Sequence, residues 1–495
     1  MSHATVLSRA GMGLNAPLVS VEAHLSNGLP AFSVVGLPES SVRESRERVR
    51  SALICSHFKW PDRRITVSLA PAELPKSGGR FDLPIALAIL VASGQLTANA
   101  LTNREFFGEL GLDGSLRQCR GLLAAVRAAT LDQRAVILPA AQAKTMAVVP
   151  GSRVTAAEDL LSACGLIKAK SLAVIKVKAD TTSTQKPAST AQITGQEVAK
   201  RALEIAAAGG HHLLMIGPPG AGKTLLAASL PPLLEDPSPS DQLELSLMRD
   251  LLGLEPNFGR PFRAPHHSTT AAGLVGGGIN ATPGEVSLAH GGVLFLDELA
   301  EFRGTVLDLL RQPLESGHIS LSRAKGTYQY PARFQLVAAM NPCPCGFAGI
   351  QNETCRCRPD VVGRYQARIS GPLLDRIDLH VRLERQPAAV LLRSSNSESH
   401  TQDLRENIER ARQRQHERQG CLNAMLNNTA LLQVCPMEPA VRHWFEDACD
   451  RLRLSGRGIH KTLRIARSLA DLAQDSALSE VTLLEAMGYR SKLPV

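Results

Sequence analysis

A glycine-rich segment at residues 217–224 limits the possible folds of this chain more than any other feature. It reads Gly-Pro-Pro-Gly-Ala-Gly-Lys-Thr. The largely apolar residues 211–216 predict a short strand before it, and residues 225–230 predict a helix after it. In that setting the glycines let backbone N–H groups point at phosphate oxygens, and the helix N-terminus adds partial positive charge. The pattern therefore predicts an α/β domain that binds a nucleotide.

The roles within this phosphate-binding loop follow from side-chain chemistry. Lys223 can reach the β- and γ-phosphates, and the Thr224 hydroxyl can bind Mg²⁺. ATP and Mg²⁺ are therefore the expected cofactors. The predicted nucleotide contacts are Gly217, Pro218, Pro219, Gly220, Ala221, Gly222, Lys223 and Thr224.

Two carboxylates, Asp297 and Glu298, follow the apolar residues 293–296. Successive side chains on a strand point opposite ways, so the two carboxylates have different predicted roles. Asp297 would hold Mg²⁺, and Glu298 would polarise the attacking water. Asn341 ends a second apolar strand and would contact the γ-phosphate, although an Asn-Pro turn at a strand end is the plain structural alternative.

Length and charge set the class of protein. A chain of 495 residues is too long for one core, so two to four domains are expected. The net charge of +9 favours an anionic partner such as nucleic acid, although a basic surface can also serve solubility alone. No export signal and no membrane-length apolar stretch is visible, so a cytoplasmic location without membrane contact is expected.

Residues 1–175 predict one α/β domain. Segments 75–82 and 108–114 resemble parts of the proteolytic domain of Lon. That resemblance implies a protease-like fold, but it places Arg80 and Leu123 where the family has its catalytic serine and lysine. Neither can form that dyad, so no protease activity is expected. Arg80 is interpreted as a surface arginine, with an anion contact as the alternative. The elements predicted here are strands at 18–25, 32–36 and 65–69, helices at 39–55 and 83–91, and a hairpin within 106–116.

The order of the motifs after residue 193 resembles that of the AAA+ ATPases. Residues 193–196, the phosphate-binding loop, residues 293–298 and residues 340–342 follow one another as in that family. The chain is also similar, in segments 260–267, 273–278 and 284–292, to the magnesium-chelatase-like subgroup, and over its whole length to a competence-protein branch of that subgroup. The resemblance implies an α/β fold with these divisions: a Lon-protease-like domain at 1–175, a linker at 176–192, an AAA+ core at 193–385 and a helical lid at 386–495.

The resemblance also assigns two arginines. Arg376, in Leu-Leu-Asp-Arg-Ile-Asp, occupies the position of the arginine finger, which acts on a neighbour's nucleotide and so implies a ring. Arg457 occupies the position of the second sensor arginine, and Arg464 is the less favoured candidate. Whether Arg457 acts on its own or on a neighbouring site stays open, and a surface ion pair is the alternative for each. In the lid, the charge-rich helix at 403–419 is predicted to be exposed or only lightly packed.

Four of the ten cysteines lie close together in the sequence, at Cys343, Cys345, Cys355 and Cys357. Four thiolates in a short loop suit tetrahedral Zn²⁺ in a structural role. Free cysteines or a redox pair are the alternatives.

A basic region surrounds these cysteines. Residues 320–376 hold eight Lys or Arg against three Asp or Glu, an excess of five positive charges. Residues 319–330 predict a hairpin, which the resemblance places in a ring pore. There Arg323 and Lys325 would contact DNA phosphates and Tyr328 would stack on a base, with a solvated basic hairpin as the alternative. Residues 273–278 would be a second, flexible pore loop, and His266 and His267 are interpreted as structural or polar pore residues.

The resemblance implies a hexameric, ATP-driven DNA helicase. It would drive branch migration as single-stranded DNA is integrated during natural transformation, with single-stranded and branched DNA and further copies of the chain as partners. The first alternative is the motor subunit of a complex that inserts Mg²⁺ into a porphyrin. An ATP-dependent protease and a non-enzymatic adaptor are the others.

Overall fold

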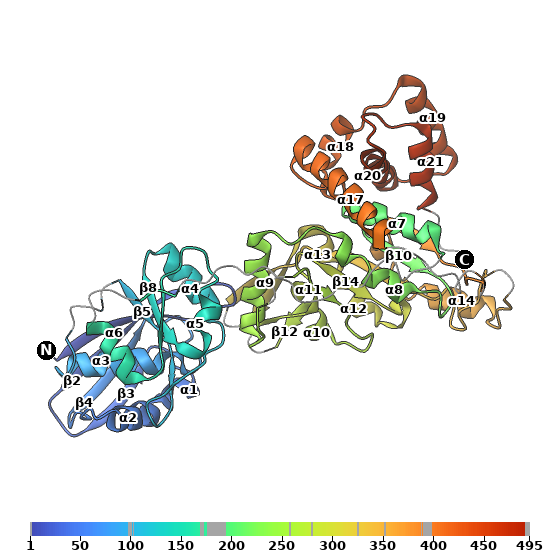
Figure 1. The fold of residues 1–495 in the computed structure, drawn as a ribbon. Coiled ribbons are helices and arrows are strands. Elements are labelled where there is room, and N and C mark those ends of the chain that lie inside the picture. The colour runs from blue at the N-terminus through green and yellow to red at the C-terminus, as the bar shows by residue number, and fades with distance from the viewer. Residues whose placement is uncertain are drawn as a thin grey trace.

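The computed structural model describes residues 2–97, 101, 103–168, 173–175, 195–256, 259–278, 281–323, 326–350, 353–387, 389 and 398–490. Three parts follow one another along the chain: an α/β part, a second α/β part and a group of helices (Figure 1). The mixed α/β prediction with a C-terminal helical region is confirmed. The predicted linker and Lys325 lie outside the described residues.

Seven strands form the N-terminal sheet, in the order β3-β4-β2-β1-β5-β8-β9. Burial alternates along β2 and β4, as expected for a sheet with one covered face. The helix α3 (Asp82–Ala92), buried along its whole length, packs against β1 and β2. The strand bounds are β1 His3–Arg9, β2 Leu18–Ser26, β3 Ala31–Val35, β4 Arg64–Ala70, β5 Arg104–Phe106, β8 Ala135–Pro139 and β9 Val154–Ala157.

The helices of this part follow the sequence pattern with one difference. The single helix predicted at 39–55 is interrupted at Glu44 and forms α1 (Ser40–Arg43) and α2 (Ser45–Cys55). The predicted hairpin is present as β6 (Glu109–Leu110) and β7 (Leu116–Arg117). The remaining helices are α4 Leu122–Leu131, α5 Ala140–Met146 and α6 Leu160–Lys168.

Arg80 is buried, so its interpretation as a surface arginine is wrong. Only 8% of the residue is exposed, and its Nη2 donates to the carbonyl of Arg120 at 2.5 Å. Burial lowers the pKa of the guanidinium, against the smaller opposing effects of Cys119 and Asp250. Leu123 is fully buried as well, so neither of the two residues matched to the dyad offers a nucleophile or a base.

Helices α4 and α9 (Pro239–Leu251) join the N-terminal part to the middle part. Leu247 of α9 lies in one hydrophobic cluster with Leu122 of α4. The Asp250 carboxylate accepts a hydrogen bond from the backbone N–H of Leu123 at 2.7 Å. A carboxylate at a helix N-terminus is favourable, so Asp250 caps a helix that belongs to the other part of the chain.

Five parallel strands form the middle sheet, in the order β11-β14-β17-β10-β18. Leu213 and Met215 of β10 face one hydrophobic cluster, and Leu214 and Ile216 face another, because helices cover both faces. The strands are β10 Leu213–Ile216, β11 Phe262–Arg263, β14 Val293–Leu296, β17 Gln335–Met340 and β18 Leu379–Arg382. The helices include α7 Glu197–Gly209, α8 Lys223–Ala228, α11 Glu285–Leu288, α12 Gly304–Asp308, α13 Arg311–Ser316, α14 Pro359–Gln366 and α15 Gly371–Leu374.

The C-terminal helices are α17 Glu398–Gln419, α18 Asn428–Val434, α19 Pro439–Arg451, α20 Gly456–Ala473 and α21 Glu480–Gly488. The light packing predicted for the charge-rich helix is wrong for α17, which buries Arg412 and Gln415 against α7. Arg412 donates to the carbonyl of Ala207 at 2.8 Å, and Gln415 donates to that of Ala208 at 3.0 Å. These carbonyls end a helix and have no intrahelical partner, so polar side chains are what this contact requires.

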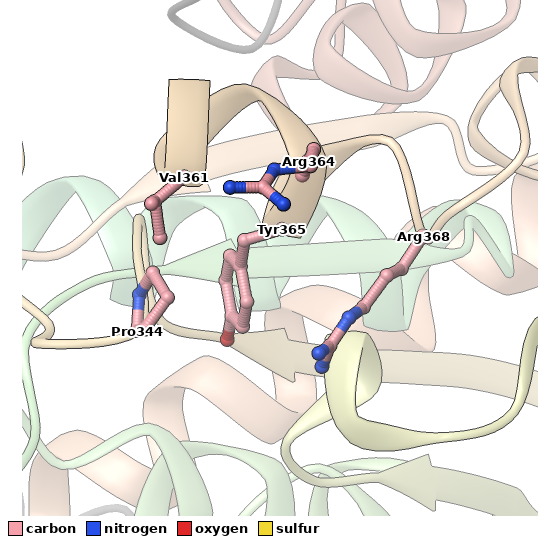
Figure 2. A pocket seen from close by; sticks show the side chains of 5 residues that line it. All are labelled: Pro344, Val361, Arg364, Tyr365 and Arg368. Carbon is pink, nitrogen blue, oxygen red and sulfur yellow. The ribbon is translucent and has the colours of Figure 1, made fainter. Parts of the chain in front are cut away.

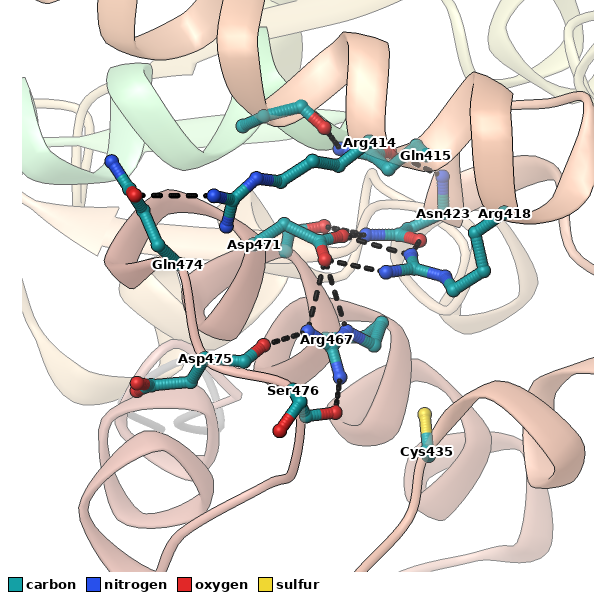
Figure 3. Close-up of polar contacts among 12 residues, drawn as sticks. Arg414, Gln415, Arg418, Asn423, Cys435, Arg467, Asp471, Gln474, Asp475 and Ser476 are labelled. Carbon is teal, nitrogen blue, oxygen red and sulfur yellow. Dashed lines mark hydrogen bonds and ion pairs between the residues drawn. The ribbon is translucent and has the colours of Figure 1, made fainter.

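A buried polar network holds α17 to α20 (Figure 3). The Asp471 carboxylate accepts from Arg467, Arg418 and Asn423 at 2.6–3.2 Å. Arg467 also donates to two backbone carbonyls beyond the end of α20. Asp471 and Arg467 are almost fully buried, so each charge depends on the other for compensation. Among the described helices, none has the length and apolar composition that a bilayer crossing requires.

We expect Asp471→Ala to destabilise the helical part by about 3 kcal/mol, because it leaves the buried Arg467 guanidinium, and the partly exposed one of Arg418, without their carboxylate. Trp444 of α19 and Trp60 are the two tryptophans of the chain, so a Trp60→Phe background makes Trp444 fluorescence a reporter of this part during urea unfolding. Asp447→Ala removes an exposed ion pair on α19 and should cost less than about 0.5 kcal/mol. Equal effects of the two substitutions would contradict the role given to the network.

Candidate nucleotide-binding site

The ends of three neighbouring strands bring the predicted site together. Ile216 of β10 pairs in register with Met340 of β17, and Leu296 of β14 pairs with Ala338. The phosphate-binding loop, the Asp297–Glu298 pair and Asn341 each follow one of these strands. Since carboxyl ends of parallel strands share one edge of a sheet, residues distant in sequence meet there.

The loop has the backbone that its glycines predict. Gly220 and Gly222 adopt positive φ values of 76° and 87°, where a side chain would be strained. Gly222 caps α8, which begins at Lys223. At Gly217 an added Cβ would lie 2.8 Å from the carbonyl oxygen of Leu383, so this strand end has no room for a side chain.

Lys223 is buried and joins two segments of the site. Its Nζ donates to the carbonyls of Gly217 and Pro218 at 2.8 and 2.9 Å, and to Oδ1 of Asn341 at 3.0 Å. Burial lowers the pKa of this ammonium, and the nearby carboxylates of Asp297 and Glu298 oppose the shift. A phosphate that replaced these acceptors would provide the charge that the buried ammonium lacks.

The two predicted Mg²⁺ ligands are neighbours. Thr224 Oγ1 donates to Asp297 Oδ2 at 3.0 Å. A hydroxyl and a carboxylate oxygen are hard ligands that suit Mg²⁺, so this pair fits the expected ion. Glu298 directs its side chain elsewhere because its backbone is left-handed, with φ of 51°.

His267 is a site residue that the sequence interpretation missed. Its Nδ1 lies 3.0 Å from the Glu298 carboxylate, and its ring lies beside that of His266, with 4.0 Å between centroids. His267 thus faces the predicted catalytic carboxylate, and its interpretation as a structural or polar pore residue stays a prediction. Its position four residues after the short strand β11, which pairs with β14, is the signal that could have located it.

The two arginines assigned by resemblance, Arg376 and Arg457, both lie beside the carboxylate of Glu315. Arg376 forms an ion pair with Glu315 of α13 and donates to the Pro372 carbonyl at 2.6 Å. Arg457, at the start of α20, lies 4.0 Å from the same Glu315 carboxylate and is half exposed. Arg464 instead donates to the Leu426 carbonyl inside the helical part. The structure thus places Arg376 and Arg457 together.

The four clustered cysteines also meet. The Sγ atoms of Cys343, Cys345, Cys355 and Cys357 all lie within 4.8 Å of one another, and Cys343 is fully buried. Partial burial opposes ionisation of Cys345, but N–H groups of the loop backbone and neighbouring thiols outweigh it and lower its pKa to about 6. The thiolate is the form that binds metals.

A second group of metal-type side chains, Asp241, Glu244 and His290, does not fit a cation. His290 Nδ1 accepts the backbone N–H of Arg333 at 3.1 Å. The neutral ring therefore carries its proton on Nε2, which lies 3.0 Å from Glu244 Oε2. A protonated nitrogen has no lone pair for a metal, so this group is an ion-pair and hydrogen-bond network.

The predicted hairpin is formed by β15 (His318–Arg323) and β16 (Gly326–Pro331). Arg323 is exposed and donates to the carbonyl of Gly278 at 3.1 Å, which joins the hairpin to the predicted second pore loop. That loop is more ordered than expected, since it includes the end of α10 (Ala271–Val275) and β12 (Gly276–Gly277), paired with β13 (Thr282–Pro283).

Tyr328 and Tyr330 of β16 contact the N-terminal part. A Cβ added to Gly13 would lie 3.1 Å from Tyr328 Cδ1 and 3.1 Å from the Tyr330 hydroxyl. Tyr330 is buried and donates to the Ala281 carbonyl at 2.7 Å, whereas Tyr328 is only half-buried. Part of the Tyr328 ring is thus already covered by the chain itself.

A hollow of about 390 Å³ lies between the cysteine segment and α14 (Figure 2). The Arg368 guanidinium lies 5.7 Å from the centre of the Tyr365 ring, in cation–π contact. The lining residues are Pro344, Val361, Arg364, Tyr365 and Arg368.

Comparisons with known proteins agree with this layout. Residues 189–391 match a family described as magnesium chelatase, subunit ChlI, and residues 398–490 match its C-terminal region. Residues 21–142 match a family described as subunit ChlI of Mg-chelatase. The chain is 45% identical to a Haemophilus influenzae protein described as competence protein ComM, over 99% of this chain and 98% of that one. It is 43% identical to the uncharacterised Escherichia coli protein YifB, over 99% of this chain and 97% of the relative, and 40% identical to an uncharacterised Mycobacterium tuberculosis protein, over 99% of each.

Proposed function

Because the chain belongs to the ComM family, within the magnesium-chelatase-like AAA+ ATPases, we propose that it is an ATP-driven motor that moves on DNA. In this proposal a ring of six copies drives branch migration as single-stranded DNA is integrated during natural transformation. The observation that carries the ATPase proposal is the meeting of Lys223, Asn341 and the Thr224–Asp297 pair at one sheet edge. The competence relative and the basic hairpin support the DNA proposal.

The chemistry assigned to each side chain follows from its contacts. Lys223 and the loop N–H groups would bind the phosphates, and Mg²⁺ held by Thr224 and Asp297 would neutralise phosphate charge. Glu298 would orient and polarise the attacking water once it leaves His267. Asn341 would exchange its contact with Lys223 for one with the γ-phosphate. The hydrogen bonds of Lys223 and Thr224 thus satisfy groups that nucleotide and Mg²⁺ would engage.

The shared position of Arg376 and Arg457 supports action on a neighbouring subunit by both. An arginine finger reaches the nucleotide of the next copy in a ring, and Arg457 lies on the same carboxylate as Arg376. Their partner, Glu315, would have to release them when a neighbour's phosphates arrive. This arrangement requires adjacent copies to form each complete site.

We expect Lys223→Ala to weaken binding of a fluorescent ATP analogue by about tenfold to hundredfold, because it removes a charged donor to phosphate. Glu298→Gln should bind the analogue normally but release phosphate about a hundredfold more slowly or worse, because an amide cannot take the proton of water. Glu301→Gln changes a nearby carboxylate that pairs with Arg368 and serves as the control. Turnover by Glu298→Gln at the wild-type rate would refute its assigned role.

Mixing two inactive variants tests the shared site. Lys223→Ala and Arg376→Ala should each lose turnover alone, since every interface then lacks one component. In an equal mixture about a quarter of randomly paired interfaces combine an intact loop with an intact arginine, so activity should return. A mixture that assembles into rings but stays inactive would show that Arg376 does not act across an interface.

DNA dependence separates the proposal from the metal-insertion alternative, which the names of the matched families favour. We expect single-stranded and forked DNA to stimulate ATP turnover. Arg323→Ala should lower DNA affinity, and it should reduce the slope of log affinity against log salt concentration by about one, because one phosphate contact is lost. Arg451→Ala, an exposed arginine on α19, should change neither quantity. ATP turnover that DNA does not change and that only a porphyrin-chelatase partner stimulates would favour the metal-insertion function.

A further inference from the structure

The spacing of the four clustered sulfur atoms points to a metal ion. The Sγ atoms of Cys343 and Cys345 are 3.3 Å apart, and Cys355 Sγ lies 3.7 and 3.6 Å from them. A disulfide requires about 2.05 Å, so these three are thiols. Four sulfurs around Zn²⁺ at about 2.3 Å would be separated by about 3.8 Å, which is close to what the cluster already has.

The beginning of the cysteine-bearing segment is attached to the candidate nucleotide site. Cys343 follows Asn341 by two residues, and Asn341 accepts from Lys223 of the phosphate-binding loop. The N–H of Gly346 donates to the carbonyl of Cys343 at 2.9 Å, which forms a tight turn over the first cysteine pair. The second pair lies just before α14, so joining the pairs would fix this turn against a helix.

The same turn contacts the phosphate-binding loop a second time, at Pro219. Gly346 has a φ of 90°, and a Cβ added there would lie 2.6 Å from Cδ of Pro219. The Gly346 backbone and the Pro219 ring therefore pack without space for a methyl group. Gly349 lies in the same segment at a φ of 69°, but a Cβ added there would meet nothing within 4 Å.

We propose that Cys343, Cys345, Cys355 and Cys357 bind one Zn²⁺ ion, and that the metal-bound segment supports the phosphate-binding loop through Gly346 and Pro219. Nucleotide affinity then depends on metal occupancy. This proposal rests on the nucleotide-binding role of the loop given above. The physical reason is that phosphate binding needs loop N–H groups held in one arrangement, and a neighbour that moves lets that arrangement relax.

Hydrogen exchange tests the proposal without nucleotide. In the full chain, Cys345→Ser with Cys357→Ser should reduce bound zinc from one ion per chain to near zero. Peptides that cover residues 213–226 should then exchange at least about tenfold faster, because the loop loses its support. Cys421→Ser changes a partly exposed cysteine outside the cluster and should alter neither zinc content nor exchange.

A pair of glycine variants separates contact with the loop from metal binding. Gly346→Ala and Gly349→Ala introduce the same methyl group at positive φ, but only the first collides with Pro219. Both should retain one zinc. Gly346→Ala should weaken binding of the fluorescent ATP analogue about tenfold, and Gly349→Ala should change it less than about twofold.

Three results would overturn the proposal. These are a purified chain without stoichiometric zinc, unchanged exchange at residues 213–226 after zinc loss, and equal nucleotide affinity in the two glycine variants. Visible absorbance from an iron–sulfur cluster would overturn the choice of metal. If the wild-type chain bound no ATP analogue, the proposed function would fail. Zinc content and hydrogen exchange would still decide whether the metal-bound segment supports the loop at residues 213–226.

Discussion

One buried ammonium group joins the segments from which the nucleotide site is built. Lys223 satisfies its donors with two carbonyls of its own loop and with Asn341 from the next strand. A buried cation without such acceptors would be costly, so this hydrogen bonding keeps the loop and the end of β17 together. An incoming phosphate competes with those acceptors. In the proposed function, phosphate binding would release Asn341, and that release would connect nucleotide arrival to movement of the segment after β17.

The sequence allowed prediction of the middle sheet and most of its site because local and long-range signals agree there. Strand, glycine loop and helix follow one another over residues 211–230, and buried parallel strands appear as continuous apolar runs. The same local argument misjudged α17 and Arg80. Polarity suggested exposure for both, but Arg412 and Gln415 satisfy carbonyls at the end of α7, and Arg80 donates to a carbonyl within the N-terminal part. Sequence alone does not show which backbone acceptor will lie opposite a polar side chain.

The contacts of His267 and Glu315 were not predicted, for a related reason. Neither residue belongs to a motif with a chemical role of its own, and each acquires importance from a charged neighbour elsewhere in the chain. His267 restrains the carboxylate that would handle water, and Glu315 neutralises the two cations that would reach another copy. Both contacts keep reactive charges occupied within a single subunit. If the proposed ring forms, a subunit outside it would present neither an unpaired Glu298 nor an unpaired Arg376, and these contacts would limit hydrolysis before assembly.

The contact between Gly13 and the two hairpin tyrosines has a mechanical consequence. Van der Waals contact is lost when heavy atoms lie more than about 4.5 Å apart, so the hairpin cannot move far without leaving Gly13. If the hairpin moves in the proposed ATPase cycle, a displacement of a few ångströms would separate it from Gly13. The N-terminal sheet would then either follow the hairpin or detach from it in each cycle.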